Sequence, residues 1–330
     1  MINRVSNNLA DYNYELPLSL IAQRPLPRRE NSRMMVLHRK EQTIEHGFFR
    51  DLPGFLRDDD LVVLNNSRVL PARHFSTDNR FEFLFLEKLA PRQWKALVKP
   101  SRKFSEERVT SIENMEARAG KRFPDGSREV ILSSDIDLQR GGALPLPPYV
   151  KRAAEPEDEE RYQTVFAQND GSLAAPTAGL HFTPEIVAAI PHVFVTLHVG
   201  PGTFRPVKTE DISHHHMSPE QFSISEDAAD AMCNARRRLA IGTTTVRVLE
   251  STYRKCGEIC GVESETDLFI YPPFTFRVVD ALLTNFHLPR STLLMLVSAF
   301  AGREFILRAY EEAVRHRYRF FSYGDCMLIF

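Results

Sequence analysis

The chain has 330 residues, of which 43% are hydrophobic and 26% are charged. These fractions are typical of globular proteins and exclude wholesale disorder, while the length predicts two domains or one domain with a large insertion. Lys and Arg number 42 against 43 Asp and Glu, so the formal net charge is -1. This balance excludes the uniformly basic surface of a non-specific nucleic-acid binder, and a nucleic-acid partner would need a local basic patch.

The sequence shows no signal for export or membrane insertion. Met1 to Asn13 lack the apolar core of a secretory signal, and the longest apolar stretch, Leu293 to Ala301, is too short to span a bilayer. Cys256 and Cys260 form a C-x3-C pair with no second pair, which fits neither a zinc site nor a disulfide framework. We therefore expect a soluble, cytoplasmic protein with reduced thiols and no bound metal.

A β-rich segment follows the apolar strand expected at Leu61 to Leu64. Apolar and polar residues alternate from Phe81 to Leu86 and again from Trp94 to Val98, on either side of a turn that contains Pro91. This spacing predicts a β-hairpin, and shorter β-like runs follow at 108–112 and 129–132. The proline-dense run 144–149 then reads as a stiff linker. We predict a small inserted β domain over residues 74–144.

The remaining sequence alternates strands and helices. Ser225 and Ser291 are predicted helix caps, and helical spacing also follows Val246 and Ile306. Strands are expected at 194–199, 239–242, 281–286 and 320–330. We therefore predict a mixed α/β or α+β fold, in which residues 1–73 and 145–330 form a larger, discontinuous body with a barrel-like sheet.

Two loops at predicted strand ends are rich in small residues. In the first, Thr177 and Gly179 would let the backbone approach a ligand, and His181 could transfer a proton; the alternative is a tight turn followed by a buried histidine. In the second, which follows His198, the pair Gly200 and Gly202 would expose backbone N–H groups to an anion. Arg205 could pair there with a carboxylate or phosphate. The glycine signal alone is weak, because the dinucleotide fingerprint is incomplete.

Three further strand ends carry polar groups. Thr243 and Thr244 open a helix that also contains Arg247, and such a helix start could bind an anion or a ribose hydroxyl, although one threonine is explained by capping alone. Asp267 precedes a predicted apolar strand, and by itself a turn-forming Asp is slightly favoured there. Asn285 and His287 flank the end of another predicted strand.

Further motifs, present or absent, argue against several classes of function. The triplet 214–216 consists of three adjacent histidines, which cannot all face one ion in regular structure, so a solvated loop is favoured over a metal site. P-loop and nucleophile-elbow motifs are absent from the sequence. Arginines gather locally, and we expect four of them to contact nucleic-acid phosphates if they share one surface: Arg24, Arg68, Arg317 and Arg319.

Long ordered segments resemble one family, the S-adenosylmethionine:tRNA ribosyltransferase-isomerases of queuosine biosynthesis. The resemblance is carried by the runs 174–183, 196–206, 242–251, 266–272 and 279–289, and it is supported by 11–17, 64–73, 145–151, 160–164 and 318–327. It covers nearly the whole chain except the predicted insertion. Such matches are far more specific than any single loop described above.

The resemblance implies a reaction. The ribosyl part of S-adenosylmethionine would be transferred to the 7-aminomethyl-7-deazaguanine base at the tRNA wobble position and isomerised, which gives epoxyqueuosine-tRNA and releases adenine and methionine. The partners would be this tRNA and S-adenosylmethionine as a co-substrate, with no other cofactor and no metal, and the protein would be a monomer.

This chemistry suggests roles for the candidate residues. His181, His198 and His287 are the proton-transfer candidates, and the sequence does not choose the base among them. Asp267 could hold the sulfonium or the amine, Arg205 or Arg247 could hold the methionine carboxylate, and Thr243, Thr244 and Asn285 could bind ribose hydroxyls or adenine.

The chain departs from the family pattern at several positions. Ser218 and Phe222 stand where the family usually has His and Tyr, Pro201 lies between two glycines, and residues 101–105 replace a glycine-containing run. Two alternatives therefore stay open: a tRNA-binding paralogue that has lost catalysis, and an S-adenosylmethionine-dependent RNA methyltransferase.

Overall fold

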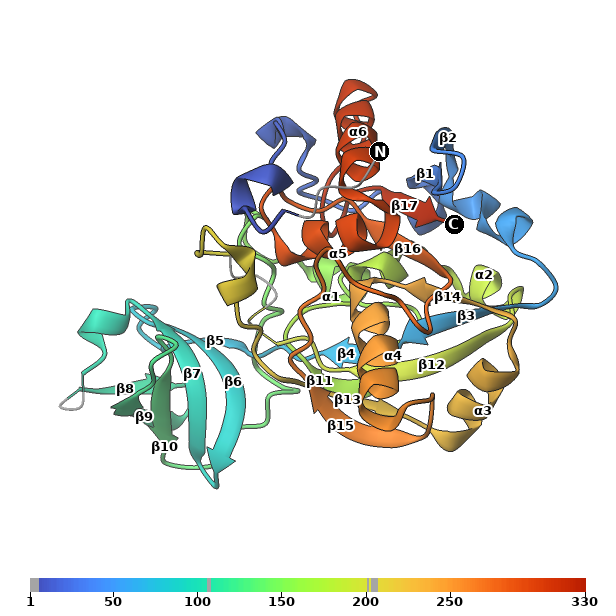
Figure 1. Ribbon diagram of the computed structural model, residues 1–330. Helices are drawn as coiled ribbons and strands as arrows, with labels where there is room; N and C mark the ends of the chain where they lie inside the picture. Colours follow the sequence, from blue (N-terminus) through green and yellow to red (C-terminus); the bar gives the residue numbers. More distant parts are fainter. Residues whose placement is uncertain (1–5, 106–107, 201, 203–206) are drawn as a thin grey trace.

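The computed structural model of the chain describes residues 6–105, 108–200, 202 and 207–330 (Figure 1). Most of its strands belong to one large mixed sheet of nine strands. Their order across the sheet is β15 (Val262–Thr266), β13 (Glu220–Ile224), β12 (His192–Leu197), β3 (Asp60–Asn65), β14 (Arg237–Ile241), β16 (Ala281–Asn285), β17 (Cys326–Ile329), β1 (Arg33–His38) and β2 (Thr43–Phe48).

The middle of this sheet is parallel. The strands β12, β3, β14 and β16 run in the same direction, whereas β13 and β15 pair antiparallel with their neighbours. β17 pairs antiparallel with β16 and parallel with β1, and β1 pairs antiparallel with β2. The sheet is mixed, as predicted. Within the described residues its pairing order runs from β15 at one edge to β2 at the other.

Alternation along the central strands buries both faces of the sheet. Val63, Ala240 and Leu282 pack into the main core, whereas their sequence neighbours Val62 and Leu283 pack into a second core on the other face. The six α-helices of the described residues are α1 (Pro156–Arg161), α2 (Pro184–Ala188), α3 (Glu226–Asn234), α4 (Thr243–Cys256), α5 (Thr292–Ala301) and α6 (Arg303–Arg315). Apolar residues of α3 to α6 fill the main core. Two covered faces explain the nearly continuous apolar runs of these strands.

A second, antiparallel sheet lies to one side of the large sheet (Figure 1). It has six strands in the order β5 (Arg73–Phe75), β6 (Glu82–Ala90), β7 (Gln93–Lys99), β10 (Arg128–Leu132), β9 (Met115–Arg122) and β8 (Val109–Ile112). Phe81, Phe83 and Phe85 lie in a core of its own, which explains their alternating spacing. A short parallel pair joins β4 (Ser67–Val69) to β11 (Asn169–Ser172).

Short 3₁₀ helices complete the described structure. They are η1 (Leu9–Tyr12), η2 (Leu18–Leu20), η3 (Arg29–Asn31), η4 (Phe49–Phe55), η5 (Ser101–Lys103), η6 (Thr177–His181) and η8 (Ile212–His214). Within the described part of the chain, no helix has both the length and the apolar character needed to cross a membrane.

Most predicted elements are confirmed. The apolar strand expected after Asp267 is wrong, because residues 267–271 form no helix or strand, and the strand expected at 320–330 is wrong in part. The hairpin β6–β7 forms, and Ser225 and Ser291 cap α3 and α5 through their side chains. The predicted strand 320–330 is restricted to β17, because Phe320 pairs with the segment near Leu20 instead, and Gly324 lies in a turn. This difference is important for the site, because Phe321 and Ser322, which lie outside β17, line the cavity described below.

Candidate functional site

A cavity lies where three of the polar segments meet. Because β14 and β16 are parallel neighbours, their carboxyl ends lie at the same edge of the sheet, next to η6. The space between them measures about 640 Å³, including the part open to solvent. Its polar lining residues include Thr177, Thr243, Thr244, Thr284, Asn285 and His287.

The structure therefore brings together much of the predicted site. Thr177, Thr243, Thr244, Asn285 and His287 were expected from loops that are far apart in the sequence, and all of them line this cavity.

A chain of hydrogen bonds fixes Asn285 in the cavity wall. Thr177 Oγ1 donates to Asn285 Oδ1 at 3.0 Å, and Asn285 Nδ2 lies 3.1 Å from His181 Nε2. His181 Nδ1 is 2.9 Å from Ser32 Oγ, whose hydroxyl donates to the Arg29 carbonyl at 3.1 Å. These directions agree with one assignment, in which neutral His181 carries its proton on Nδ1 and accepts from Asn285.

His181 itself lies behind this wall. Its side chain is buried, and burial lowers its pKa to about 3, with the nearby Arg29 and Arg319 guanidiniums acting in the same direction. A histidine that stays neutral and touches the cavity only through Asn285 is suited to positioning. This placement matches the alternative of a buried histidine after a tight turn.

His287 is the predicted histidine that lines the cavity. It is buried, and burial lowers its pKa to about 3. Its Nε2 lies 3.1 Å from Thr284 Oγ1, and its backbone N–H donates to the Tyr310 hydroxyl at 3.0 Å. His287 is therefore a neutral imidazole, fixed in place, beside the polar groups of the cavity.

The start of α4 contributes hydroxyl groups to the same cavity. Gly242 precedes the helix with φ of +88°, a conformation that favours glycine, and it turns the chain from β14 into α4. Thr243 and Thr244 follow it in the cavity lining, and Thr244 Oγ1 accepts a bond from Asn65 Nδ2 at 3.4 Å. The helix N–H groups and hydroxyls together form a polar end suited to a ligand oxygen.

His198 lies in a different place. It lines a groove on the outer strands with Thr196, Gln221 and Phe222, whereas its neighbour Val199 lines the cavity. The imidazole is half-buried, and among the described residues its Nδ1 has no hydrogen-bond partner. Burial lowers its pKa against the opposing effect of Asp170. The structure thus separates His198 from His287.

Arg247 is held by the fold. Its guanidinium forms a buried ion pair with Glu220 and donates to the carbonyls of Leu268 (3.0 Å) and Thr266 (3.2 Å). Glu220 Oε1 in turn accepts from the Gly200 N–H at 2.7 Å. Arg247 therefore anchors the loop after β12 and lies outside the cavity lining.

The other predicted ligand-binding positions are dispersed. Gly179 packs against Phe166 and Thr164, where a Cβ would lie 2.8 Å from either side chain, and Gly202 lies beside Ser218. Asp267 is exposed and lies outside the cavity lining. Arg205 falls outside the described residues.

Four cavity residues were missed from the sequence: Tyr149, Tyr162, Phe321 and Ser322. Tyr149 was assigned to a linker, but its ring lies 4.1 Å from that of Phe321 and its hydroxyl 2.5 Å from Ser322 Oγ. Burial raises the pKa of both Tyr149 and Tyr162. In the sequence, these four residues could have been noticed because they lie in the segments 145–151, 160–164 and 318–327, which resemble the family.

The predicted tRNA-contacting arginines fall in more than one place. Arg24 is exposed and binds Glu155 with both terminal nitrogens, and the half-buried Arg319 donates to the Arg24 carbonyl. Arg317, two residues before Arg319, is exposed. Arg68 lies beside Asp170 and donates to the Ala167 carbonyl at 2.7 Å.

The sequence matches a known family over nearly its whole length. The family is described as "Queuosine biosynthesis protein", and the match spans residues 9–329. A protein of Thermotoga maritima named S-adenosylmethionine:tRNA ribosyltransferase-isomerase is 48% identical over 336 residues, covering 97% of this chain and 99% of the relative. A protein of the same name from Sulfurihydrogenibium sp. is 46% identical over 337 residues, with the same coverage.

A solved structure is also similar. It is the crystal structure of an S-adenosylmethionine tRNA ribosyltransferase from Thermotoga maritima, with 39% identity over the superposition. The match covers 97% of this chain and all of that chain, with a TM-score of 0.57.

Proposed function

The chain belongs to the queuosine biosynthesis protein family and is an S-adenosylmethionine:tRNA ribosyltransferase-isomerase, and we propose that it carries out this reaction in the cavity lined by Thr177, Thr243 and His287. One observation carries the assignment of the site. The segments 174–183, 242–251 and 279–289 are far apart in the sequence, and they meet at this cavity with hydroxyl, amide and imidazole groups.

The reaction we propose uses the properties of the sulfonium ion. S-adenosylmethionine would lose a proton from C5′, which the positive sulfur acidifies, and its ribosyl part would be transferred to the aminomethyl group of the 7-aminomethyl-7-deazaguanine base of tRNA. Isomerisation then gives epoxyqueuosine-tRNA and releases adenine and methionine. These steps need proton transfer and hydrogen-bond donors, which the cavity contains.

His287 is the proton-transfer group in this proposal. Its neutral imidazole can accept a proton at pH 7, and a pKa lowered by burial means that the protonated form readily passes the proton on. Protonation helps adenine to depart. The neighbouring Thr284 hydroxyl, at 3.1 Å, orients the ring.

The remaining cavity residues bind and orient the substrate. Thr243, Thr244 and Asn285 present groups that fit ribose hydroxyls or adenine, and the Tyr149 and Phe321 rings offer an apolar wall. His181 acts through Asn285 as a positioning residue. Arg247 and Glu220 hold the Gly200 loop, so the methionine carboxylate is assigned to Arg205 rather than to Arg247, whose three side-chain nitrogens have partners already.

We propose that tRNA contacts the face next to the segment 317–322. Arg24, Arg317 and Arg319 belong to this region, and the following residues Phe321 and Ser322 line the cavity. Arg68 extends the contact toward Asp170. A local patch of this kind is compatible with a net charge of -1.

The organisation of the protein is proposed on the same basis. Residues 74–144 would form an inserted domain on the discontinuous body 1–73 and 145–330, because the six-stranded sheet has its own apolar core. The protein would act as a cytoplasmic monomer with S-adenosylmethionine as co-substrate.

A labelling experiment tests the function. Purified protein is incubated with tRNA that carries the precursor base and with S-adenosylmethionine labelled either in the ribose or in the methyl group. The proposal predicts ribose label in the tRNA nucleoside, methyl label in free methionine, and one adenine released per modified tRNA. Methyl label in tRNA would identify a methyltransferase, and tRNA binding without adenine release would identify an inactive paralogue.

A further inference from the structure

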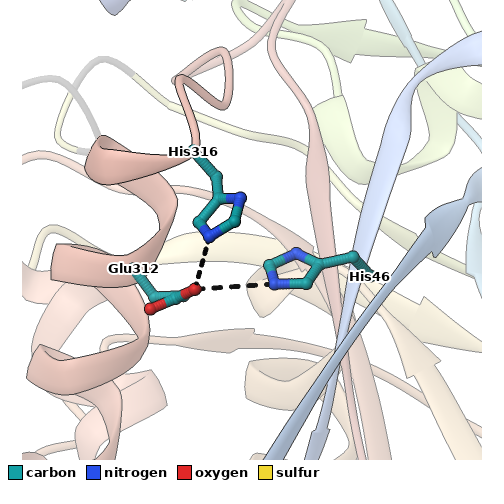
Figure 2. A group of neighbouring side chains, drawn as sticks. All are labelled: His46, Glu312 and His316. Carbon is teal, nitrogen blue, oxygen red and sulfur yellow. Dashed lines mark ion pairs between the residues drawn. The ribbon is translucent and has the colours of Figure 1, made fainter.

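We propose that His46, Glu312 and His316 form a binding site for one divalent transition-metal ion, separate from the catalytic cavity. Figure 2 shows the three side chains pointing toward one another, His46 from β2 and the other two from the end of α6 and the residue that follows it. The proposal is independent of the ribosyltransferase reaction.

The ligand atoms have nearly the spacing that a metal ion requires. Glu312 Oε1 lies 2.7 Å from His316 Nε2 and 3.7 Å from His46 Nε2, and one ligand atom of each residue lies within 4.8 Å of the others. Zinc–nitrogen and zinc–oxygen bonds of roughly 2.0–2.2 Å place tetrahedral ligand atoms about 3.4 Å apart. Small side-chain rotations therefore suffice to bring all three atoms to one ion.

A neighbouring tyrosine orients one of the imidazoles. The Tyr318 hydroxyl lies 2.7 Å from His46 Nδ1, and the Arg33 guanidinium lies over the Tyr318 ring, 3.7 Å from its centre. Histidines that bind metals generally use their second nitrogen in this way, which fixes the tautomer and leaves Nε2 free to coordinate. Arg33 also donates to the His316 backbone carbonyl at 2.8 Å, so the same arginine contacts the tyrosine beside His46 and the backbone of His316.

The ligand types indicate which ions would bind. Two imidazoles and one carboxylate favour Zn²⁺, Co²⁺, Ni²⁺ or Cu²⁺ over Mg²⁺ and Ca²⁺, which prefer oxygen ligands. Three protein ligands leave at least one position for water.

One contact opposes the ion. Arg315 forms an ion pair with the other oxygen of Glu312, and its positive charge would compete with a metal. Because this charge opposes the ion, Arg315→Ala should bind the metal ion more tightly than the wild type does. A cluster of histidines without a metal function would show no such gain.

A bound ion would tie β2 to the end of α6. The segment that begins at His316 continues through Tyr318 to Phe321 and Ser322 in the cavity wall, so the ion would stabilise this segment from outside. We therefore expect metal binding to raise the thermal stability without being required for the reaction.

The test measures Zn²⁺ and Co²⁺ binding by calorimetry and by the visible absorption of Co²⁺, in full-length protein. All samples carry His214→Gln and His216→Gln, which removes two exposed histidines of the triplet that could bind metal by themselves. We expect one ion per chain. His46→Ala and His316→Ala should each weaken binding at least about tenfold, and Tyr318→Phe, which keeps the ring, about tenfold.

His38→Ala is the matched control. His38 also pairs with a glutamate, Glu45, at 2.9 Å on the neighbouring strands, but that pair is not part of the three-ligand group. Its loss should leave the affinity unchanged, and Zn²⁺ should raise Tm in this control but not in the His46→Ala, His316→Ala double variant. Absence of binding to the parent protein, or equal binding by the parent and the double variant with native circular dichroism, would overturn the proposal.

Discussion

Asn285 Nδ2 lies 3.1 Å from His181 Nε2, so a histidine outside the cavity determines how an amide in its wall is oriented. The other side of the amide accepts from Thr177 at 3.0 Å, which leaves the orientation of Asn285 fixed from both ends. The same histidine is neutral, because burial and two arginines lower its pKa to about 3. A positioning function and a catalytic-base function of His181 make different predictions.

Replacing His181 separates the two functions. His181→Gln keeps an oxygen that can accept from Asn285, whereas His181→Ala removes it. We expect kcat/KM to fall about a hundredfold in the alanine variant, the scale of an effect of a misplaced group, and less than about tenfold in the glutamine variant. Adenine release measured at several S-adenosylmethionine concentrations checks this. Equal and complete loss in both variants would instead identify His181 as the base.

The buried histidines also predict how stability depends on pH. In the unfolded chain a histidine takes up a proton near pH 6.5, but His181 and His287 in the folded protein do so only at about pH 3. The unfolded state therefore binds more protons between these values, and the free energy of unfolding should fall as the pH drops below about 6.5.

Each such histidine contributes a slope of about 1.4 kcal/mol per pH unit within that window. Urea unfolding at pH 7, 6 and 5 measures it, and His181→Gln should lose one such contribution. His214→Gln, at an exposed position, should keep the wild-type slope. An unchanged slope in His181→Gln would contradict the buried neutral state.

His287 and His198 should differ in their effect on catalysis. His287 lines the cavity, whereas His198 lines a separate groove on the outer strands. We expect His287→Ala to lower kcat about 10²- to 10⁴-fold, the usual contribution of a proton-transfer group, and His198→Ala to keep kcat within about tenfold. Single-turnover adenine release measures both. The reverse ranking would move the reaction to the His198 groove.

The sequence predicts local structure well where one physical rule decides it. Ser225 and Ser291 cap helices because each side chain accepts from a backbone N–H three residues later, and that rule needs only the neighbouring residues. Phe81, Phe83 and Phe85 alternate because one face of their strand is buried. Asn285 and His287 could be found in the same way, as polar groups at the end of an apolar strand.

Long-range packing decides what the sequence did not show. Tyr149 follows a proline-dense run that resembles a linker, and only its contact with Phe321 makes it part of the cavity. His181 and His287 have the same local appearance, but their separation by Asn285 depends on how β16 and η6 pack. The apolar character of 320–330 suggested one strand, whereas pairing with the segment near Leu20 withdraws its first half.

The Tyr149 hydroxyl should orient the cavity wall through Ser322, which lies 2.5 Å away. Tyr149→Phe keeps the ring against Phe321 and removes this bond, so we expect a modest rise in KM for S-adenosylmethionine, about three- to tenfold, with the free energy of unfolding reduced by about 1 kcal/mol. Tyr149→Ala removes the ring as well and should raise KM further. Equal kinetics for Tyr149→Phe and Tyr149→Ala would exclude a contribution of the ring.

The ion pair between Glu220 and Arg247 should contribute to the fold and to the site at once. Both side chains are buried, and Glu220 also accepts from the Gly200 N–H, so Glu220→Gln leaves an arginine charge in the interior. Loss of one partner of a buried pair is expected to lower the free energy of unfolding by about 3–5 kcal/mol. Glu116→Gln breaks the exposed pair with Arg118 and should cost less than about 1 kcal/mol in the same urea titration. The Gly200 loop follows Val199 of the cavity lining, so KM for S-adenosylmethionine should rise in Glu220→Gln and stay unchanged in Glu116→Gln. An equal free energy of unfolding for the two variants would show that the buried pair is dispensable.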